Sequence, residues 1–226
     1  MIGTVASQNR INLTKLITLV NIKMQIVLKR GNVMARAGLD KNAVIEKAAL
    51  LANKTGLESV TLKILADSLN VQPPSLYNYI RGLDDLQNEL MLYGWQHMEE
   101  RMMEAAVGVS GYDAWEAICR AFYDYATENP GVFSAMLWYN KYQNNEAEKV
   151  TERLFAICSK ITSSLNISEE NCNHLIRTFR AFLEGFSLLV NNHAFGHSLP
   201  VEDSFEFSLK LLTAGMKELE EKSSNF

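Results

Sequence analysis

Apolar residues recur every three or four positions along most of the chain after residue 40, a spacing that predicts amphipathic helices nearly throughout. The first such run opens at Asp40, a residue type that caps helix N-termini. It carries Val44, Ala48 and Leu51 on one face and ends at Gly56, as helices commonly do. The pattern therefore predicts an all-α fold that begins with a helix between these two ends.

A second, short helix is predicted directly afterwards. Thr61 is its expected N-cap, and Leu62, Leu65 and Leu69 form its apolar stripe. Asn70 follows the stripe and favours a left-handed stop.

A third helix is predicted to start at Pro73 and Pro74, because the N–H that proline lacks would be unpaired in a first turn anyway. Leu76 and Ile80 lie four positions apart and are expected to face inward. The residues expected on the outer face, on the flanks or at the end are Pro74, Ser75, Tyr77, Asn78, Tyr79 and Arg81.

Two short helices joined by a tight turn, the second polar and aromatic outside, are typical of a helix-turn-helix. In that motif the second helix enters the major groove of DNA. Ser75 and Asn78 can hydrogen-bond to base edges, the hydroxyls of Tyr77 and Tyr79 suit phosphates, and either proline can contact a thymine methyl. The alternative on pattern alone is an αα-hairpin whose polar side chains are merely solvated.

The stretch VTLKILADSLNVQPPSLYNYIRGLDDLQNEL resembles the DNA-binding head of the TetR family of bacterial repressors. The residues that match the family pattern in order and spacing are Thr61, Ala66, Val71, Ser75, Leu76 and Tyr77. The resemblance covers about residues 38–100, with the motif at about 62–81. It implies that Thr61 and Tyr77 touch phosphates and that the bases are faced by Pro73, Pro74, Ser75, Asn78 and Tyr79. Gln72 is also a DNA-binding candidate.

One position departs from the family pattern. The family often has a lysine where this chain has Leu83, and Arg81 is the candidate for that phosphate contact.

A helix rich in leucine and methionine follows Gly82 and is predicted to link this head to a helical body at residues 101–226. Many aromatic and methionine side chains in this part are candidates for lining an apolar ligand cavity, and plain core is the alternative for each. The candidates are Trp95, Trp115, Phe122, Tyr125, Phe133, Met136, Trp138, Tyr139 and Phe182.

The last two long segments also carry apolar stripes. The resemblance implies that they pair with their copies in a homodimer, and two-fold symmetry would imply a roughly palindromic operator. The stretch that contains Glu184 and Gly185 resembles the C-terminal domain of one TetR subgroup, which often has His-Gly at these two positions.

Charge changes this picture less than the motif does. The chain has 226 residues, 47% apolar and 21% charged, an ordinary globular composition. Residues 1–81 hold 11 Lys/Arg and 4 Asp/Glu, whereas residues 82–226 hold 11 Lys/Arg and 22 Asp/Glu. This asymmetry of charge indicates a polyanion partner for the first part of the chain, or it arises by chance. Residues 34–81 alone are only +2, so the DNA prediction does not rest on charge.

Residues 1–33 have five basic and no acidic side chains, without the pattern of a membrane span or a signal peptide. They are either a basic arm against DNA or an untranslated leader read as protein. We favour the leader, because Lys29-Arg30-Gly31 can be encoded by a purine-rich run a few codons before Met34.

Other chemistries find little support in the sequence. Cys119, Cys158 and Cys172 have no metal-ligand spacing and suit a reducing cytoplasm as small core residues. His193 and His197 lie four apart, but Gly196 between them favours a loop over a metal-binding helix. No catalytic motif is found, so we predict no catalytic site, metal or cofactor.

The motif predicts DNA binding, and the resemblance to the TetR family implies a cytoplasmic, homodimeric repressor of double-stranded operator DNA that leaves it when an unknown small-molecule effector binds. The sequence predicts no membrane partner. The alternatives are a transcriptional activator and a helix-turn-helix protein that acts through a protein partner.

Overall fold

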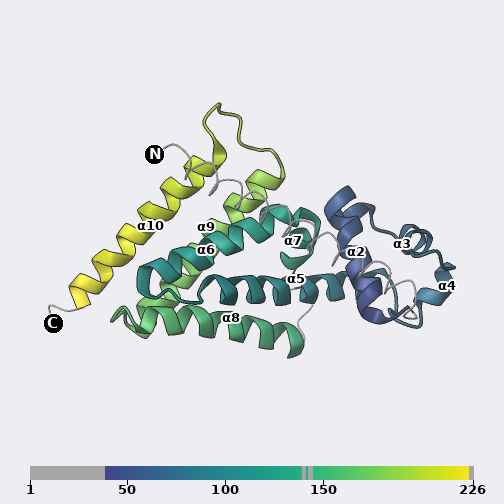
Figure 1. Ribbon diagram of the computed structural model, residues 1–226, viewed down its shortest axis with the longest axis horizontal. Coiled ribbons are helices and arrows are strands. Elements are labelled where there is room, and N and C mark those ends of the chain that lie inside the picture. The colour runs from purple at the N-terminus through teal and green to yellow at the C-terminus, as the bar shows by residue number, and fades with distance from the viewer. Residues whose placement is uncertain (1–38, 139–140, 142–144, 224–226) are drawn as a thin grey trace, which may run out of the picture. The chain divides into compact units, whose positions relative to one another are not determined.

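The computed structural model describes residues 39–138, 141 and 145–223, and all regular structure in these ranges is helical (Figure 1). The predicted all-α fold is confirmed. The predicted extension at residues 1–33 and the cavity candidate Tyr139 lie outside the described residues. Within the described ranges, no helix is both long and apolar enough to span a membrane.

The first elements are α2 (Lys41–Thr55), the 3-10 helix η1 (Leu57–Ser59), α3 (Leu62–Ser68) and α4 (Pro73–Leu76). The boundaries of α2 and α3 agree with the prediction, because the residues at their ends cap or stop a helix.

Side-chain caps fix the starts of the first two α-helices. The Ala43 N–H donates to Asp40 Oδ1 at 2.8 Å, and the Ile64 N–H donates to Thr61 Oγ1 at 3.2 Å. The ends are left-handed: Gly56 has φ 86° and Asn70 has φ 56°. The predicted caps and stops are therefore confirmed.

The third predicted helix is shorter than expected. Only Pro73–Leu76 is α-helical, and the chain continues as turns through Tyr79. The Tyr77 N–H donates to Pro74 O at 3.3 Å and the Tyr79 N–H to Leu76 O at 2.9 Å, which tightens the chain to the 3-10 spacing.

The remaining helices form the rest of the fold. They are α5 (Leu83–Ala105), α6 (Gly111–Glu128), α7 (Pro130–Met136), α8 (Asn145–Ser163), α9 (Glu169–Asn191) and α10 (Val201–Ser223). Helix α5 lies beside α6, α7 and α8, while α9 lies beside α6, α8 and α10 (Figure 1). Because α5 runs without a break through residue 100, it crosses the predicted boundary between head and body.

Helix α7 packs very closely on α5. A Cβ added at Gly94 on α5 would lie 2.5 Å from Met136 Cγ and 2.8 Å from Val132 Cγ1, so a larger residue there would force these side chains to move. Next to it, the Trp95 indole N–H donates to Met136 O at 3.2 Å. The short helix α7 is thus held directly against the long helix that follows the helix-turn-helix.

The C-terminal part of α2 also contacts α7. Asn53 donates from Nδ2 to Asn129 Oδ1 at 2.8 Å and accepts from the Val132 N–H at 2.9 Å. Gly131 lies so near that an added Cβ would fall 2.0 Å from Ala52 O. We call these contacts, made by Ala52, Asn53, Asn129, Gly131 and Val132, the α2–α7 clasp.

Candidate DNA-binding surface and ligand cavity

The helix-turn-helix formed by α3 and α4 separates buried from exposed side chains sharply. Leu76 and Ile80 are 0% and 1% exposed, as predicted. Tyr77 is 60% exposed, and Pro74 and Asn78 are exposed beside it. Since a large aromatic ring and an amide stand in solvent here, this surface is available to a macromolecular partner.

The other predicted DNA-binding residues lie around the same surface. Thr61 and Gln72 are exposed, and Pro73, Ser75 and Tyr79 are half-buried. Thr61 Oγ1 accepts the capping hydrogen bond, and the hydroxyl hydrogen can still be donated to another acceptor.

Arg81 already has a partner. Its guanidinium and its backbone N–H both donate to the Asp85 carboxylate, with Nη2 at 3.0 Å from Oδ1. The Arg81 side chain is 90% exposed and that of Asp85 only 15%, so the guanidinium is accessible to a partner but already pairs with a half-buried carboxylate. Leu83 is 40% exposed, and Lys63 on α3 is an exposed cation that the sequence interpretation did not select.

A cavity of about 500 Å³ lies among α5, α6, α8 and α9. This volume falls within the range of small-molecule sites. The residues that line it are Trp95, Met102, Trp115, Ile118, Cys119, Phe122, Thr151, Glu152, Leu154, Phe155, Cys158, Ile176, Phe179, Arg180 and Leu183.

Three of the predicted cavity residues, Trp95, Trp115 and Phe122, line this space. The other described candidates do not: Tyr125, Phe133 and Met136 are buried elsewhere in the core, Trp138 stacks with Lys141, and Phe182 packs against Phe186 and Phe205.

The lining residues that sequence reasoning missed lie mainly on α8 and α9. Phe179 and Leu183 on α9 are four apart, as are Leu154 and Cys158 on α8. This helical spacing was visible in the sequence, but it looks the same whether a stripe faces a solid core or a cavity.

Buried apolar side chains form the inner wall. Trp115 is 1% exposed and meets the Phe179 ring edge-on, with centroids 5.1 Å apart. Its indole Nε1–H has no hydrogen-bond partner among the described residues. A buried donor without a partner is uncommon and costs free energy, so it marks a place where a ligand acceptor would be favourable.

The two cysteines that line the cavity also have apolar surroundings. Burial raises the pKa of the Cys119 thiol well above its ordinary value, and it raises the pKa of Cys158 to about 12. Both cysteines are therefore neutral thiols near pH 7, and neither is an activated nucleophile.

Charged side chains stand at the exposed side of the cavity. Glu152 and Arg180 are exposed, and Arg180 Nε donates to Glu184 at 2.7 Å while its guanidinium lies 5.7 Å from the Trp95 ring centroid. The wall and the mouth are thus chemically distinct.

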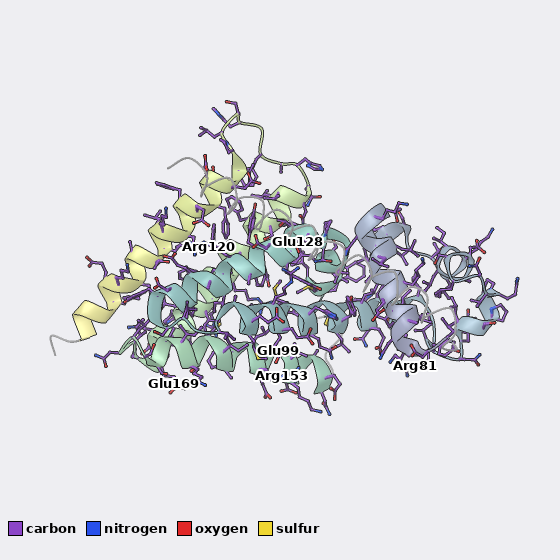
Figure 2. All side chains as sticks on the ribbon, in the orientation of Figure 1. Arg81, Glu99, Arg120, Glu128, Arg153 and Glu169 are labelled. Carbon is purple, nitrogen blue, oxygen red and sulfur yellow. The ribbon has the colours of Figure 1, made fainter. Side chains whose placement is uncertain are left out.

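An ion pair joins two of the helices around the cavity. Arg153 on α8 donates through Nε to both carboxylate oxygens of Glu99 on α5, at 2.7 and 2.9 Å (Figure 2). Glu99 is nearly buried, so the pair ties the cavity wall on α8 to the helix that begins at the helix-turn-helix.

Large apolar side chains are exposed on both of the last two helices. Leu188 on α9 and Phe207 and Leu211 on α10 are 42%, 69% and 62% exposed. We call these three residues the α9/α10 apolar surface.

Among the described residues, no group of His, Cys, Asp or Glu is placed to hold a metal ion. His193 and His197 lie in the loop between α9 and α10, as predicted. Their spacing of four is therefore not helical.

The arrangement defines a class: an all-α protein with a helix-turn-helix and a helical cavity-forming part. Residues 115–212 match the family described as Tetracyclin repressor-like, C-terminal domain. YobS, an uncharacterized HTH-type transcriptional regulator of Bacillus subtilis (strain 168), is 30% identical over 182 residues, 80% of this chain and 94% of that protein.

Two solved structures have the same fold. A TetR variant from Acinetobacter baumannii AYE in complex with minocycline has a TM-score of 0.63 at 19% identity, covering 80% of this chain and 98% of that one. BioQ with its natural double-stranded DNA operator has a TM-score of 0.57 at 18% identity, covering 80% and 99%. The chain belongs to the TetR family of transcriptional regulators, and like its relatives it is not an enzyme.

Proposed function

We propose that this regulator is a homodimeric repressor that binds operator DNA through α3 and α4 and leaves it when a small molecule enters the cavity. The observation that carries the DNA-binding part is the exposed Tyr77 and Asn78 over the buried Leu76 and Ile80. A solvated αα-hairpin has no need to hold an aromatic ring 60% exposed. BioQ, which shares the fold, is known in complex with its operator.

Each residue has a role that fits its chemistry. Asn78 and Ser75 read base edges, with Pro73, Pro74 and Tyr79 beside them, and Gln72 at the start of α4 reaches the same groove. The positioning contacts to phosphates come from Thr61, Tyr77 and Arg81. Arg81, whose side chain is 90% exposed, would exchange the Asp85 carboxylate for a phosphate.

We assign the dimer contact to the α9/α10 apolar surface. Three large apolar side chains from two adjacent helices would lose their solvent exposure in a four-helix interface. A two-fold dimer places two helix-turn-helix motifs on two half-sites, which makes a palindromic operator the natural target.

Two routes of direct contact connect the cavity to the helices that flank the helix-turn-helix, α5 after it and α2 before it. Helix α5 carries both Trp95, which lines the cavity, and the first residues after the motif. The second route passes from Trp95 through Met136 O to α7, and from α7 through the α2–α7 clasp to Asn53. A ligand that moves the cavity wall would act on the motif through both. The TetR variant with the same fold binds minocycline.

We further propose that residues 38–100 form the DNA-binding domain and residues 101–226 the ligand-binding and dimerisation domain, working in the cytoplasm where the chromosome lies.

The test is fluorescence anisotropy of the purified protein with the DNA upstream of its own gene, across a salt series. Tight binding that falls steeply with salt and exceeds binding to scrambled DNA is expected. Equal, weak binding to both DNAs would count against operator recognition at this site. The direction of regulation follows from a reporter gene: activation in place of repression would favour the activator alternative.

A further inference from the structure

We infer that the ligand of the α5–α6–α8–α9 cavity is an uncharged, largely apolar molecule with a hydrogen-bond acceptor that receives the Trp115 indole N–H. This inference deepens the proposed function and rests on it for its regulatory meaning, but it concerns binding alone.

The residues that line the cavity indicate that the ligand carries no charge. The lining residues that are buried are all apolar or thiol-bearing: Trp95, Met102, Trp115, Ile118, Cys119, Phe122, Phe179 and Leu183. A charged group carried against this wall would lose its hydration without gaining a partner, which is strongly unfavourable. The raised pKa of both cavity thiols reports the same low-polarity surroundings.

The mouth of the cavity does not select an ion either. Its one cation, Arg180, is engaged by Glu184 and lies against the Trp95 ring, so an anionic ligand would have to compete with an existing carboxylate. Glu152 is exposed to water, where attraction for a cation is weak. Among the lining residues, the two charges therefore leave a neutral ligand as the best match.

The unpaired indole N–H of Trp115 indicates that the ligand carries a hydrogen-bond acceptor. The Trp115 ring lines the cavity, the residue is 1% exposed, and its Nε1–H is unpaired among the described residues. By contrast, the other cavity tryptophan, Trp95, already donates its indole N–H to Met136 O. Of the two cavity tryptophans, Trp115 is therefore the one whose indole N–H is left for a ligand, and a carbonyl or ether oxygen would satisfy it.

The experiment uses Nile red, an uncharged dye whose emission rises in apolar surroundings, and displaces it with four naphthalenes of matched size. They are acetylnaphthalene, ethylnaphthalene, naphthoate and naphthylmethylammonium. We expect acetylnaphthalene to bind about tenfold more tightly than ethylnaphthalene, because only the ketone accepts a hydrogen bond. Both ions should bind at least about 30-fold more weakly than the ketone.

Trp115→Phe removes the donor and keeps an aromatic ring. In this variant the preference for the ketone over the hydrocarbon should fall to within about twofold. Trp138→Phe, the same change at a tryptophan outside the cavity lining, should keep the tenfold preference. Should Trp115→Phe fold poorly, the ranking of the four naphthalenes by the unmodified protein still decides the ligand class, and the NMR resonance of the Trp115 indole N–H, which should move downfield with acetylnaphthalene and not with ethylnaphthalene, decides the donor.

Tighter binding of either ion, or no preference for the ketone in the unmodified protein, would overturn the inference. Because these measurements contain no DNA, they separate it from the proposed function. If acetylnaphthalene binds as expected but leaves operator affinity unchanged at saturation, the ligand class stands and release by this ligand fails. If operator DNA binds tightly but no uncharged naphthalene does, the ligand class fails and DNA binding stands.

Discussion

The helix-turn-helix and the cavity-forming helices both bury apolar side chains, but they present opposite surfaces to their partners. In α3, α4 and the turns that follow α4, a small core of Leu65, Leu76 and Ile80 supports polar and aromatic side chains that face outward. Around the cavity, helices of 18 to 23 residues turn apolar groups toward an internal space. One surface is external and separable from stability, while the other is part of the core that stabilises the fold. Substitutions should therefore separate partner binding from stability in the first region and not in the second.

The largest effect is expected where the external surface is removed. The double variant Tyr77→Ala/Asn78→Ala should lower operator affinity at least about 100-fold, because a base contact and a phosphate contact are lost together. Its unfolding free energy should stay within about 0.5 kcal/mol of the unmodified protein, as for other exposed positions. Anisotropy with operator DNA and urea unfolding measure the two quantities.

The matched contrast is Leu76→Ala, one residue away and fully buried. It should cost about 2–5 kcal/mol of stability. Unchanged operator binding by the double variant would reject the assigned residue roles, and a large loss of stability would show that the two surfaces are not separable.

A smaller but still large effect is expected at the α2–α7 clasp. In an ordinary helix Gly131→Ala would be stabilising by about 1 kcal/mol. Here the new Cβ would lie 2.0 Å from Ala52 O, far inside contact distance, so backbone must move. We expect a net loss of about 2–3 kcal/mol in urea unfolding.

Gly196→Ala is the control for this change, since an added Cβ there has no neighbour within 4 Å. It should change stability by less than about 0.5 kcal/mol. Equal stabilities for the two variants would mean that α2 and α7 do not approach as closely as described.

Removing the clasp's hydrogen bonds should have an intermediate effect. Asn53→Ala leaves the Val132 N–H and Asn129 Oδ1 without this partner and should cost about 1–2 kcal/mol. If the clasp carries the signal from the cavity, the variant should bind Nile red normally while a bound ligand changes its operator affinity less. Asn173→Ala, which removes a bond within one helix only, is the control. A full ligand response in Asn53→Ala would leave α5 as the route of coupling.

The same contrast explains what the sequence could predict. The helix ends at Asp40, Thr61, Asn70 and Pro73 depend on residues within three or four positions, and the structure confirms them. The early end of α4 is not predicted, because it depends on backbone hydrogen bonds of 3-10 spacing that leave no pattern in the side chains.

The cavity and the clasp depend on residues far apart in the chain. Asn53 and Asn129 are 76 positions apart, and nothing local to either predicts the other. Aromatic content selects Trp115, which lines the cavity, but it equally selects Phe133, which is buried in the core outside the cavity lining. Whether an apolar residue lines a cavity or fills the core depends on its packing neighbours, and these cannot be read from the linear pattern.

The smallest perturbation probes the cavity wall without changing a residue. With its pKa raised to about 12, Cys158 is about one part thiolate in ten thousand at pH 8, against roughly a quarter for a free cysteine of pKa about 8.5. Alkylation by iodoacetamide, followed by mass spectrometry of the peptide containing Cys158, should be at least about 100-fold slower in the folded protein than in urea. The labelling rate of the folded protein should rise about tenfold per pH unit above pH 8, whereas the rate of the unfolded chain levels off.

The raised pKa of Cys158 also makes the stability of the fold depend on pH. The neutral thiol contributes fully to the free energy of unfolding below about pH 8.5, and this contribution declines as pH rises toward 12. Rapid labelling of the folded protein at neutral pH would mean that the wall is wet and polar, and the contrast between the two surfaces would then be lost.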